Sequence, residues 1–86
     1  MNYESSNLRS AVGTRAQEYF DGNIYFGTFF ERLPEKATEL SDPEIEELTD
    51  LIEHEPAVGG FFGISLTEHA EYRQRMANVI KRLRKG

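Results

Sequence analysis

The apolar residues of this 86-residue chain recur at helical spacing in four separate segments, and this pattern restricts the fold more than any other feature. Spacings of three and four residues line up one face of an α-helix, whereas a half-buried strand needs strict alternation of apolar and polar residues. No stretch of useful length alternates in this way. The chain is therefore expected to be all-α, and its length allows a single domain, residues 1–86.

Glycine and proline mark the borders of the four segments. Gly22 can take the left-handed position that ends a helix, and Pro34 and Pro56 each stop one. Residues 34–40 are expected to form a linker with room for one extra turn. The expected helices cover residues 7–21, 25–33, 42–54 and 66–84. Short connections between four helices predict a compact four-helix bundle.

Each expected helix contributes an apolar stripe to a shared core. The four stripes consist of Leu8, Val12, Ala16, Tyr19 and Phe20; Phe26, Phe29, Phe30 and Leu33; Ile45, Leu48, Leu51 and Ile52; and Tyr72, Met76, Val79, Ile80 and Leu83. Ile24 is expected to turn inward at the corner between the first two helices.

Two capping boxes predict where the last two helices begin. Ser41 is followed three residues later by Glu44, and Ser65 is followed three residues later by Glu68. In such a box the serine oxygen accepts a hydrogen bond from a free N–H group of the first turn. We therefore expect Ser41 and Ser65 to be N-caps.

Charge is unevenly distributed along the chain, whose net charge is −5. Residues 35–56 contain nine acidic residues and one basic residue, whereas residues 57–86 contain six basic and two acidic residues. The acidic side chains expected to face away from the core are Glu46, Glu47, Asp50 and Glu53. Two explanations stay open: a surface that attracts a basic partner, or an acidic helix paired with a basic helix of the same molecule.

Composition argues against most enzymatic chemistry. The chain has no cysteine, which excludes a disulfide scaffold, a thiolate metal site and a cysteine nucleophile. Its two histidines, His54 and His69, are too few for a zinc site, which needs three or four well-spaced ligands. The carboxylates of the acidic helix are expected on an exposed face, where nothing separates their pKa values. We expect no catalytic residues, no metal and no cofactor.

Two glycine-containing stretches match known ligand loops only in part. Residues 59–63 lack the Lys-Ser/Thr ending of a phosphate loop. Their glycines are explained more simply as leaving space for the rings of Phe61 and Phe62. Residues 21–26 resemble the second half of an EF-hand loop. Its first, third and twelfth positions would be Gln17, Tyr19 and Thr28, which are not the oxygen ligands that calcium needs. No calcium is expected.

Neither nucleic acid nor membrane is an expected partner. Residues 81–85 form a basic run, but cations in the last turn of a helix also stabilise its dipole, and the overall pI is about 5.0. No run approaches the roughly 20 apolar residues of a membrane helix, and residues 1–9 are polar, so no signal peptide is expected. Together with the absence of cysteine, this predicts a cytoplasmic protein.

The order of several features along residues 8–85 resembles one small family. The corner Tyr19-Phe20-Asp21-Gly22-Asn23-Ile24 precedes two aromatic residues, Phe29 and Phe30. The last helix follows Ile64-Ser65-Leu66 and ends in Ile80-Lys81-Arg82-Leu83. This layout resembles the bacterial immunity proteins of the colicin D type and their self-protective relatives, from which the glycine-rich loop of this chain departs.

The resemblance implies a short four-helix protein that binds and blocks a nuclease toxin. In that interpretation Glu46, Glu47, Asp50 and Glu53 mimic the nucleic-acid substrate of a basic toxin, and Phe61 and Phe62 provide an apolar anchor. Two alternatives stay open. One is a small regulatory or self-associating protein that uses the Phe61-Phe62 loop as its interface, so that a homo-oligomer is not excluded. The other is a small-molecule binder with a pocket among its aromatic residues.

Overall fold

Helices account for most of the chain in the computed structural model, which describes the backbone of residues 3–61 and 63–85, and the side chains of residues 7–37, 39–61 and 63–85. The five helices in these residues are α1 (Tyr3–Phe20), α2 (Phe26–Glu31), α3 (Glu35–Glu39), α4 (Pro43–Glu53) and α5 (Leu66–Arg84). The described residues contain no strand, and their only isolated β-bridge joins Val58 to Ile64. The predicted all-α class is confirmed.

The number and the borders of the helices differ from the prediction. The expected linker, residues 34–40, contains a short helix of its own, α3. The first helix begins four residues earlier than predicted, at Tyr3, and α2 is shorter, with only six residues. The three long helices, α1, α4 and α5, have 18, 11 and 19 residues.

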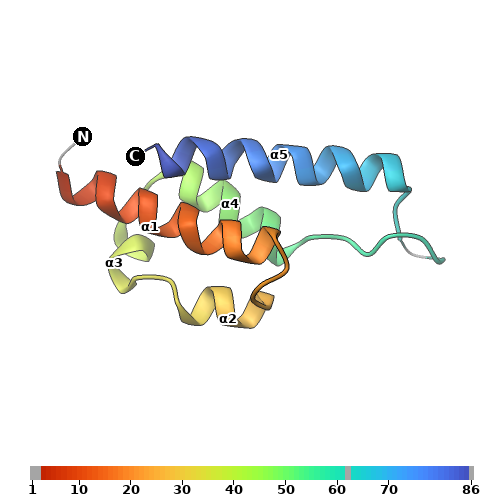
Figure 1. The fold of residues 1–86 in the computed structure, drawn as a ribbon, viewed down its shortest axis with the longest axis horizontal. Helices are drawn as coiled ribbons and strands as arrows, with labels where there is room; N and C mark the ends of the chain where they lie inside the picture. The colour runs from red at the N-terminus through yellow and green to blue at the C-terminus, as the bar shows by residue number, and fades with distance from the viewer. Residues whose placement is uncertain (1–2, 62, 86) are drawn as a thin grey trace.

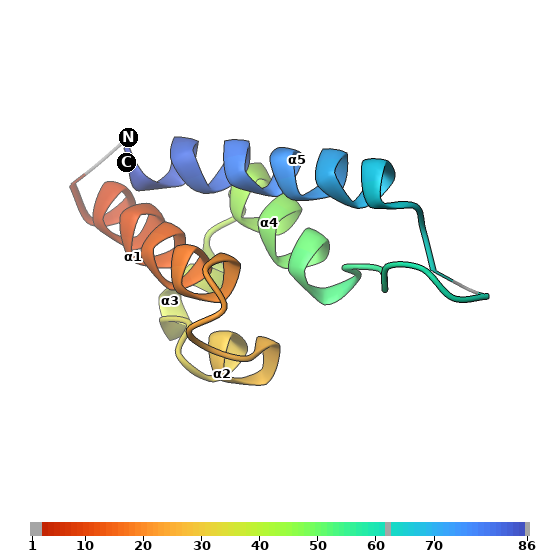
Figure 2. The same cartoon turned by 45° about the vertical axis from the view of Figure 1, so that its right-hand side comes forward.

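The long helices define the shape of the molecule, which measures 45 × 22 × 21 Å. Figure 1 shows α5 lying along α1 and α4, while α2 and α3 lie on the side of α1 that faces away from α5. The turned view of Figure 2 keeps this arrangement. In both views the connection between α4 and α5 projects beyond the helices.

The core forms where the predicted stripes meet. Its buried members are Val12, Ala16, Phe29, Ala37, Ile45, Leu48, Leu51, Ile52, Met76, Val79, Ile80 and Leu83. Tyr19, Phe20, Ile24, Phe30, Leu33, Leu40 and Tyr72 pack against them while partly exposed. Phe26 was wrongly placed in the core: 49% of it is exposed, because it opens α2 at the surface, where its ring packs edge-on against Phe30.

The two predicted N-caps have different outcomes. Ser65 caps α5, since its hydroxyl accepts a hydrogen bond of 3.1 Å from the Glu68 N–H. Ser41 does not cap α4. Pro43 is the first residue of that helix, so the cap falls on Asp42, whose Oδ1 accepts from the N–H groups of Glu44 (2.9 Å) and Ile45 (3.4 Å). Ser41 lies one residue too early.

Gly13 lies where α1 packs closely against the end of α5. A Cβ atom at this position would lie 2.8 Å from Cγ of Arg84 and 3.0 Å from its backbone nitrogen. Glycine costs a helix interior about 1 kcal/mol relative to alanine. Here it lets the two longest helices pack backbone to backbone.

Candidate functional site

Three acidic side chains form a row on the outer side of α4. Glu46, Asp50 and Glu53 follow one another at spacings of four and three residues, which align them along one face of a helix. All three are exposed, and in the described part of the chain none of them forms an ion pair with a lysine or an arginine. We call these three residues the acidic row.

Glu47 lies apart from the acidic row, although it was predicted with it. Its carboxylate is half-buried beside α5, where Oε2 lies 3.2 Å from Nε of Arg75 and Oε1 lies 3.7 Å from Nη2 of Arg82. Glu44 also pairs with Arg82. Pairing with a basic helix of the same molecule, one of the two explanations that the sequence left open, therefore applies to one side of α4. The other side, which carries the acidic row, faces solvent.

The start of α4 is held by a buried arginine of α1. Arg9 is only 7% exposed, and its guanidinium binds Asp42 through Nη1 and Glu44 through Nη2, the latter at 2.6 Å. These hydrogen bonds raise the pKa of Arg9. Hydrogen bonds from Arg9 and then Arg82 lower the pKa of Glu44. Among the described residues, the Nε atom of Arg9 is buried without a hydrogen-bond partner.

Asp42 carries both functions at this junction, as helix cap and as ion-pair partner. Burial alone would raise its pKa, but the hydrogen bond from Arg9 and the backbone N–H groups of α4 together lower it. The start of α4 is therefore linked to α1 by contacts that the sequence pattern does not show.

An apolar hollow of about 190 Å³ lies beside the acidic row, between α3, the residues on either side of it, and α4. Its lining residues are Leu33, Ala37, Leu40, Ile45, Glu46 and Thr49. Glu46 thus belongs both to the hollow and to the acidic row. The hollow is smaller than the pockets of roughly 300–1,000 Å³ that hold small-molecule ligands, which disfavours the small-molecule alternative at this place.

A second, larger hollow of about 480 Å³ lies between α1 and the end of α5. It is lined by Gln17, Ala77, Lys81, Arg84 and Lys85, so its charge is positive. Lys81 and Arg84 fall in the last turn of α5 and Lys85 is its C-cap, where cations also stabilise the negative end of the helix dipole.

Glu55 is the centre of a polar cluster that the sequence analysis missed. Its carboxylate accepts hydrogen bonds from the Tyr19 hydroxyl (2.8 Å) and from Arg73 (3.2 Å), and lies 2.9 Å from Nε2 of His69. Burial would raise the pKa of Glu55, but these three partners outweigh it and lower the pKa. A carboxylate held in this way is a weak base, so the arrangement suits linkage of the elements rather than proton transfer.

Burial and the neighbouring Glu55 carboxylate raise the pKa of Tyr19 to about 12. Tyr72, on the same helix as His69, donates its hydroxyl hydrogen to the backbone oxygen of Leu51, and burial raises its pKa as well. The sequence offers one signal for this cluster: Glu55 directly precedes Pro56, which is expected to end the helix, so Glu55 lies beyond the regular turns that carry the acidic row.

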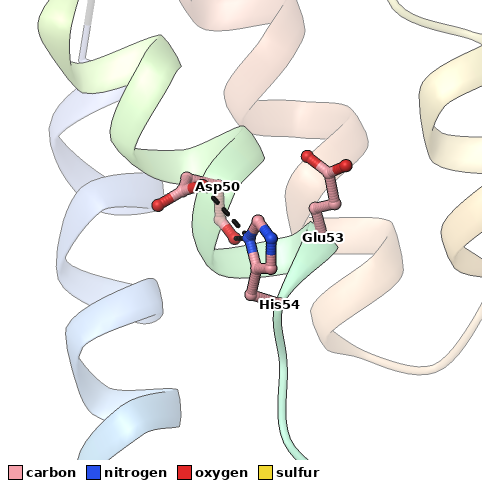
Figure 3. A group of neighbouring side chains, drawn as sticks. All are labelled: Asp50, Glu53 and His54. Atoms are coloured by element: carbon pink, nitrogen blue, oxygen red, sulfur yellow. Dashed lines mark hydrogen bonds and ion pairs between the residues drawn. The ribbon is translucent and has the colours of Figure 1, made fainter.

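One acidic group could offer ligands to a cation. Asp50, Glu53 and His54, shown in Figure 3, place three ligand atoms within 4.8 Å of one another at the end of α4. His54 Nδ1 lies 3.1 Å from Asp50 Oδ1. All three side chains are exposed, and such groups are common on acidic helices without a metal. We assign no metal to them.

The predicted apolar anchor lies on the projecting connection. Phe61 is 93% exposed, and Phe62 lies outside the described residues. Gly59 and Gly60 adopt φ angles of 72° and 70°, which favour glycine, and the N–H of Gly59 donates to the Ile64 oxygen at 2.9 Å. The connection therefore has defined backbone hydrogen bonds at its base and presents an aromatic ring at the end of the molecule.

Comparison of the chain with protein-family models, with curated proteins and with solved structures finds no match. Within the described residues, no helix is both long enough and apolar enough to cross a membrane. The choice among functions thus depends on the surfaces described above.

Proposed function

We propose that this protein is a non-enzymatic inhibitor that binds a basic partner of the nuclease-toxin class through the acidic row and occupies its nucleic-acid site. The observation that carries the proposal is the exposure of Glu46, Asp50 and Glu53 on one side of α4, without a lysine or arginine partner in the described residues. Three carboxylates left in solvent repel one another, and a basic partner relieves that repulsion.

The spacing of the acidic row supports mimicry of nucleic acid. At a rise of about 1.5 Å per residue, Glu46 and Glu53 are separated by about 10 Å along the helix axis. Phosphates along one strand of a duplex advance by about 3.4 Å each, so the row spans the rise of about three nucleotides. A groove that binds a phosphate backbone therefore presents cations at a spacing that the row can meet.

The rest of the proposal follows the resemblance to immunity proteins. We count α1, α2, α4 and α5 as the four helices of a bundle, with α3 as an added turn. An inhibitor that protects the cell producing it acts where the toxin acts on nucleic acid, so the proposal places the protein in the cytoplasm. Phe61 is the apolar contact that the proposal adds to the acidic row, since its ring is 93% exposed.

A charge-reversal experiment tests the proposal. The triple variant Glu46→Lys, Asp50→Lys and Glu53→Lys is compared with a control triple, Glu31→Lys, Glu39→Lys and Glu71→Lys, which reverses three exposed acids on other helices. The probe is the nuclease domain of colicin D. We expect wild-type and control to inhibit RNA cleavage, and the acidic-row variant to associate at least about tenfold more slowly in low salt.

Two results count against the proposal. One is equal inhibition by the acidic-row variant and the control, and the other is association that does not weaken as salt is raised from about 0.02 M to about 0.15 M. Circular dichroism of each variant checks that the helical content is retained, because exposed substitutions away from caps usually change stability by less than about 0.5 kcal/mol each.

Self-association through the Phe61-Phe62 loop is the second candidate, and the exposure of Phe61 favours it. An aromatic side chain that is almost fully exposed on a small protein is a typical anchor for a contact between proteins. This candidate predicts a concentration-dependent oligomer in analytical ultracentrifugation. Phe61→Ala together with Phe62→Ala would return it to a monomer, whereas reversal of the acidic row would leave the oligomer unchanged.

A further inference from the structure

We infer that the apolar hollow beside Glu46 receives one apolar side chain of the protein partner, while Glu46 binds a lysine or arginine placed about one helical turn from that side chain. The inference rests on the proposed function and specifies its partner: a segment that is basic and carries an apolar residue of the size of leucine or methionine. The acidic row alone would accept any cationic surface, whereas the hollow selects among cationic surfaces.

The hollow has the construction of an anchor pocket. Two of its lining residues, Ala37 (1% exposed) and Ile45 (5% exposed), belong to the buried core, so this part of the lining is held in place by core packing. Leu33 and Leu40, both partly buried against the same core, complete the apolar lining. The energy of protein interfaces is concentrated where a side chain fills such a desolvated pocket.

The volume of the hollow argues for a single side chain. About 190 Å³ is below the range of roughly 300–1,000 Å³ that small-molecule ligands occupy. It is ample for one leucine or methionine side chain. The two polar lining residues, Glu46 and Thr49, lie on adjacent turns of α4, and the Thr49 hydroxyl donates to the backbone oxygen of Glu46 at 3.1 Å, within its own helix.

Charge complementarity decides which apolar segment can enter. Glu46 is exposed at the hollow, and Asp50 follows it one turn later on the same side of α4. A guest flanked by acidic residues would be repelled there, whereas one flanked by lysine or arginine is held at both positions. The hollow and the acidic row therefore act as one surface, in which the apolar side chain provides affinity and the charges provide selection.

Three synthetic helical peptides test the inference directly. The first carries a leucine with lysines four residues before and after it; the second replaces the leucine by alanine; the third replaces the lysines by glutamates. Each is titrated into the ¹⁵N-labelled full chain, and amide shifts are followed by NMR at low salt. We expect the first to bind, with the largest shifts at Ile45, Glu46 and Thr49, the second to bind about tenfold more weakly, and the third not to bind.

Variants of the protein complete the test. Thr49→Met fills the hollow from its rim, and Thr14→Met is its control, since Thr14 is also a partly buried helical threonine whose hydroxyl donates within its own helix. Glu46→Gln removes the charge at the hollow, and Glu53→Gln removes a charge of the same row away from it. We expect Thr49→Met and Glu46→Gln each to weaken the first peptide about tenfold and both controls to change it less than about twofold. If Thr49→Met does not fold, the inference is tested by comparing how tightly the leucine and alanine peptides bind the wild-type chain.

The outcomes separate this inference from the proposed function. Equal binding of the leucine and alanine peptides, or no binding of either, overturns the hollow as an anchor site, while the inhibition assay with the nuclease domain still decides the acidic row. Concentration-dependent dimerisation that Thr49→Met abolishes would assign the hollow to a second copy of this chain and would also overturn the inference. If the wild-type protein does not inhibit the nuclease domain but still binds the leucine peptide, the proposed function is overturned. The surface would then bind a basic partner that is not a nuclease.

Discussion

Nε2 of His69 lies 2.9 Å from Oε2 of Glu55, and this contact ties the first turns of α5 to the residue that follows the C-cap of α4. The same carboxylate accepts from Tyr19 near the end of α1. Arg73, also on α5, donates to the backbone oxygen of Phe20 and lies 4.1 Å above the centre of its ring. One carboxylate thus connects the three longest helices of the molecule at the end from which the α4–α5 connection projects.

Substitution of Glu55 should destabilise the protein much more than substitution of a neighbouring acid. Glu55→Gln keeps the size of the side chain but removes the charge that three donors share, and we expect the free energy of unfolding to fall by about 1–3 kcal/mol. Glu53→Gln is the control, because Glu53 is exposed and should change it by less than about 0.5 kcal/mol. Urea unfolding measures both. Equal effects would mean that the cluster does not hold the helices together.

Acid should destabilise the fold through three carboxylates. Arg9 and other donors hold the pKa values of Asp42, Glu44 and Glu55 below their ordinary values. A lowered native pKa stabilises the fold above the unfolded value, near 4, and the stabilisation is lost as pH falls through the native value. We expect the free energy of unfolding to be level between about pH 5 and about pH 9 and to fall steadily below about pH 4.

Asp42→Asn should flatten this acid-dependent decrease, since it removes one of the three groups while an asparagine still caps a helix. Urea unfolding between about pH 2 and pH 6 measures the slope for both proteins. Parallel curves for wild-type and Asp42→Asn would show that Arg9 does not favour the charged form of Asp42.

Tyr19 should ionise later than an ordinary tyrosine. Its pKa is raised to about 12, against an unperturbed value of about 10. Because the raised native pKa belongs to an acid, its contribution to stability is present below about pH 10 and is lost as pH rises through about 12. Ultraviolet titration should show a late phase that disappears in Tyr19→Phe. A late phase that persists in this variant would assign it to another tyrosine.

The cap of α4 gives a prediction opposite to the one made from the sequence. Asp42→Ala should lower the free energy of unfolding by about 1–2 kcal/mol, or more, because it removes the N-cap and also leaves Arg9 without one of its partners. Ser41→Ala should have little effect, since Ser41 is exposed and does not cap the helix. Thermal unfolding compares the two. A larger effect at Ser41 would place the start of α4 one residue earlier.

This cap shows where sequence-based prediction succeeds and where it fails for this chain. Helical spacing is a local property, so the stripe of α5 and the buried Phe29 could be predicted. Ser41 and Asp42 are both good capping residues, and Pro43 at the first position of the helix places the cap on Asp42. The bond that Arg9 makes to Asp42, 33 positions away, is contained in no local pattern.

The candidate site illustrates the same limit. Glu46 and Glu47 are adjacent and chemically identical, yet Glu46 faces solvent and Glu47 lies beside α5, where it pairs with Arg75 and Arg82, because successive residues of a helix point about 100° apart. The apolar hollow is lined by residues of α3, its flanking residues and α4, which surround a common space only in the folded chain. Its existence, unlike the charge of α4, could not be predicted from spacing.

The close approach of α1 and α5 at Gly13 leads to a last prediction. Alanine normally stabilises a helix interior by about 1 kcal/mol relative to glycine. At Gly13 the new methyl group would lie 2.8 Å from Cγ of Arg84 and 3.0 Å from its backbone nitrogen, and while the arginine side chain can move, the backbone nitrogen cannot move without shifting α5. We therefore expect Gly13→Ala to destabilise the protein by about 1–3 kcal/mol in spite of the gain in helix propensity.

Gly27→Ala is the matched control for Gly13→Ala. Gly27 also lies in a helix, α2, but a Cβ atom there would meet nothing within 4 Å, so the alanine should stabilise the protein by about 0.5–1 kcal/mol. The two substitutions are chemically identical and differ only in what the methyl group meets, so opposite signs in urea unfolding would isolate the packing of α1 against α5. Stabilisation by both would mean that the two helices are farther apart in solution than the contact at Arg84 requires.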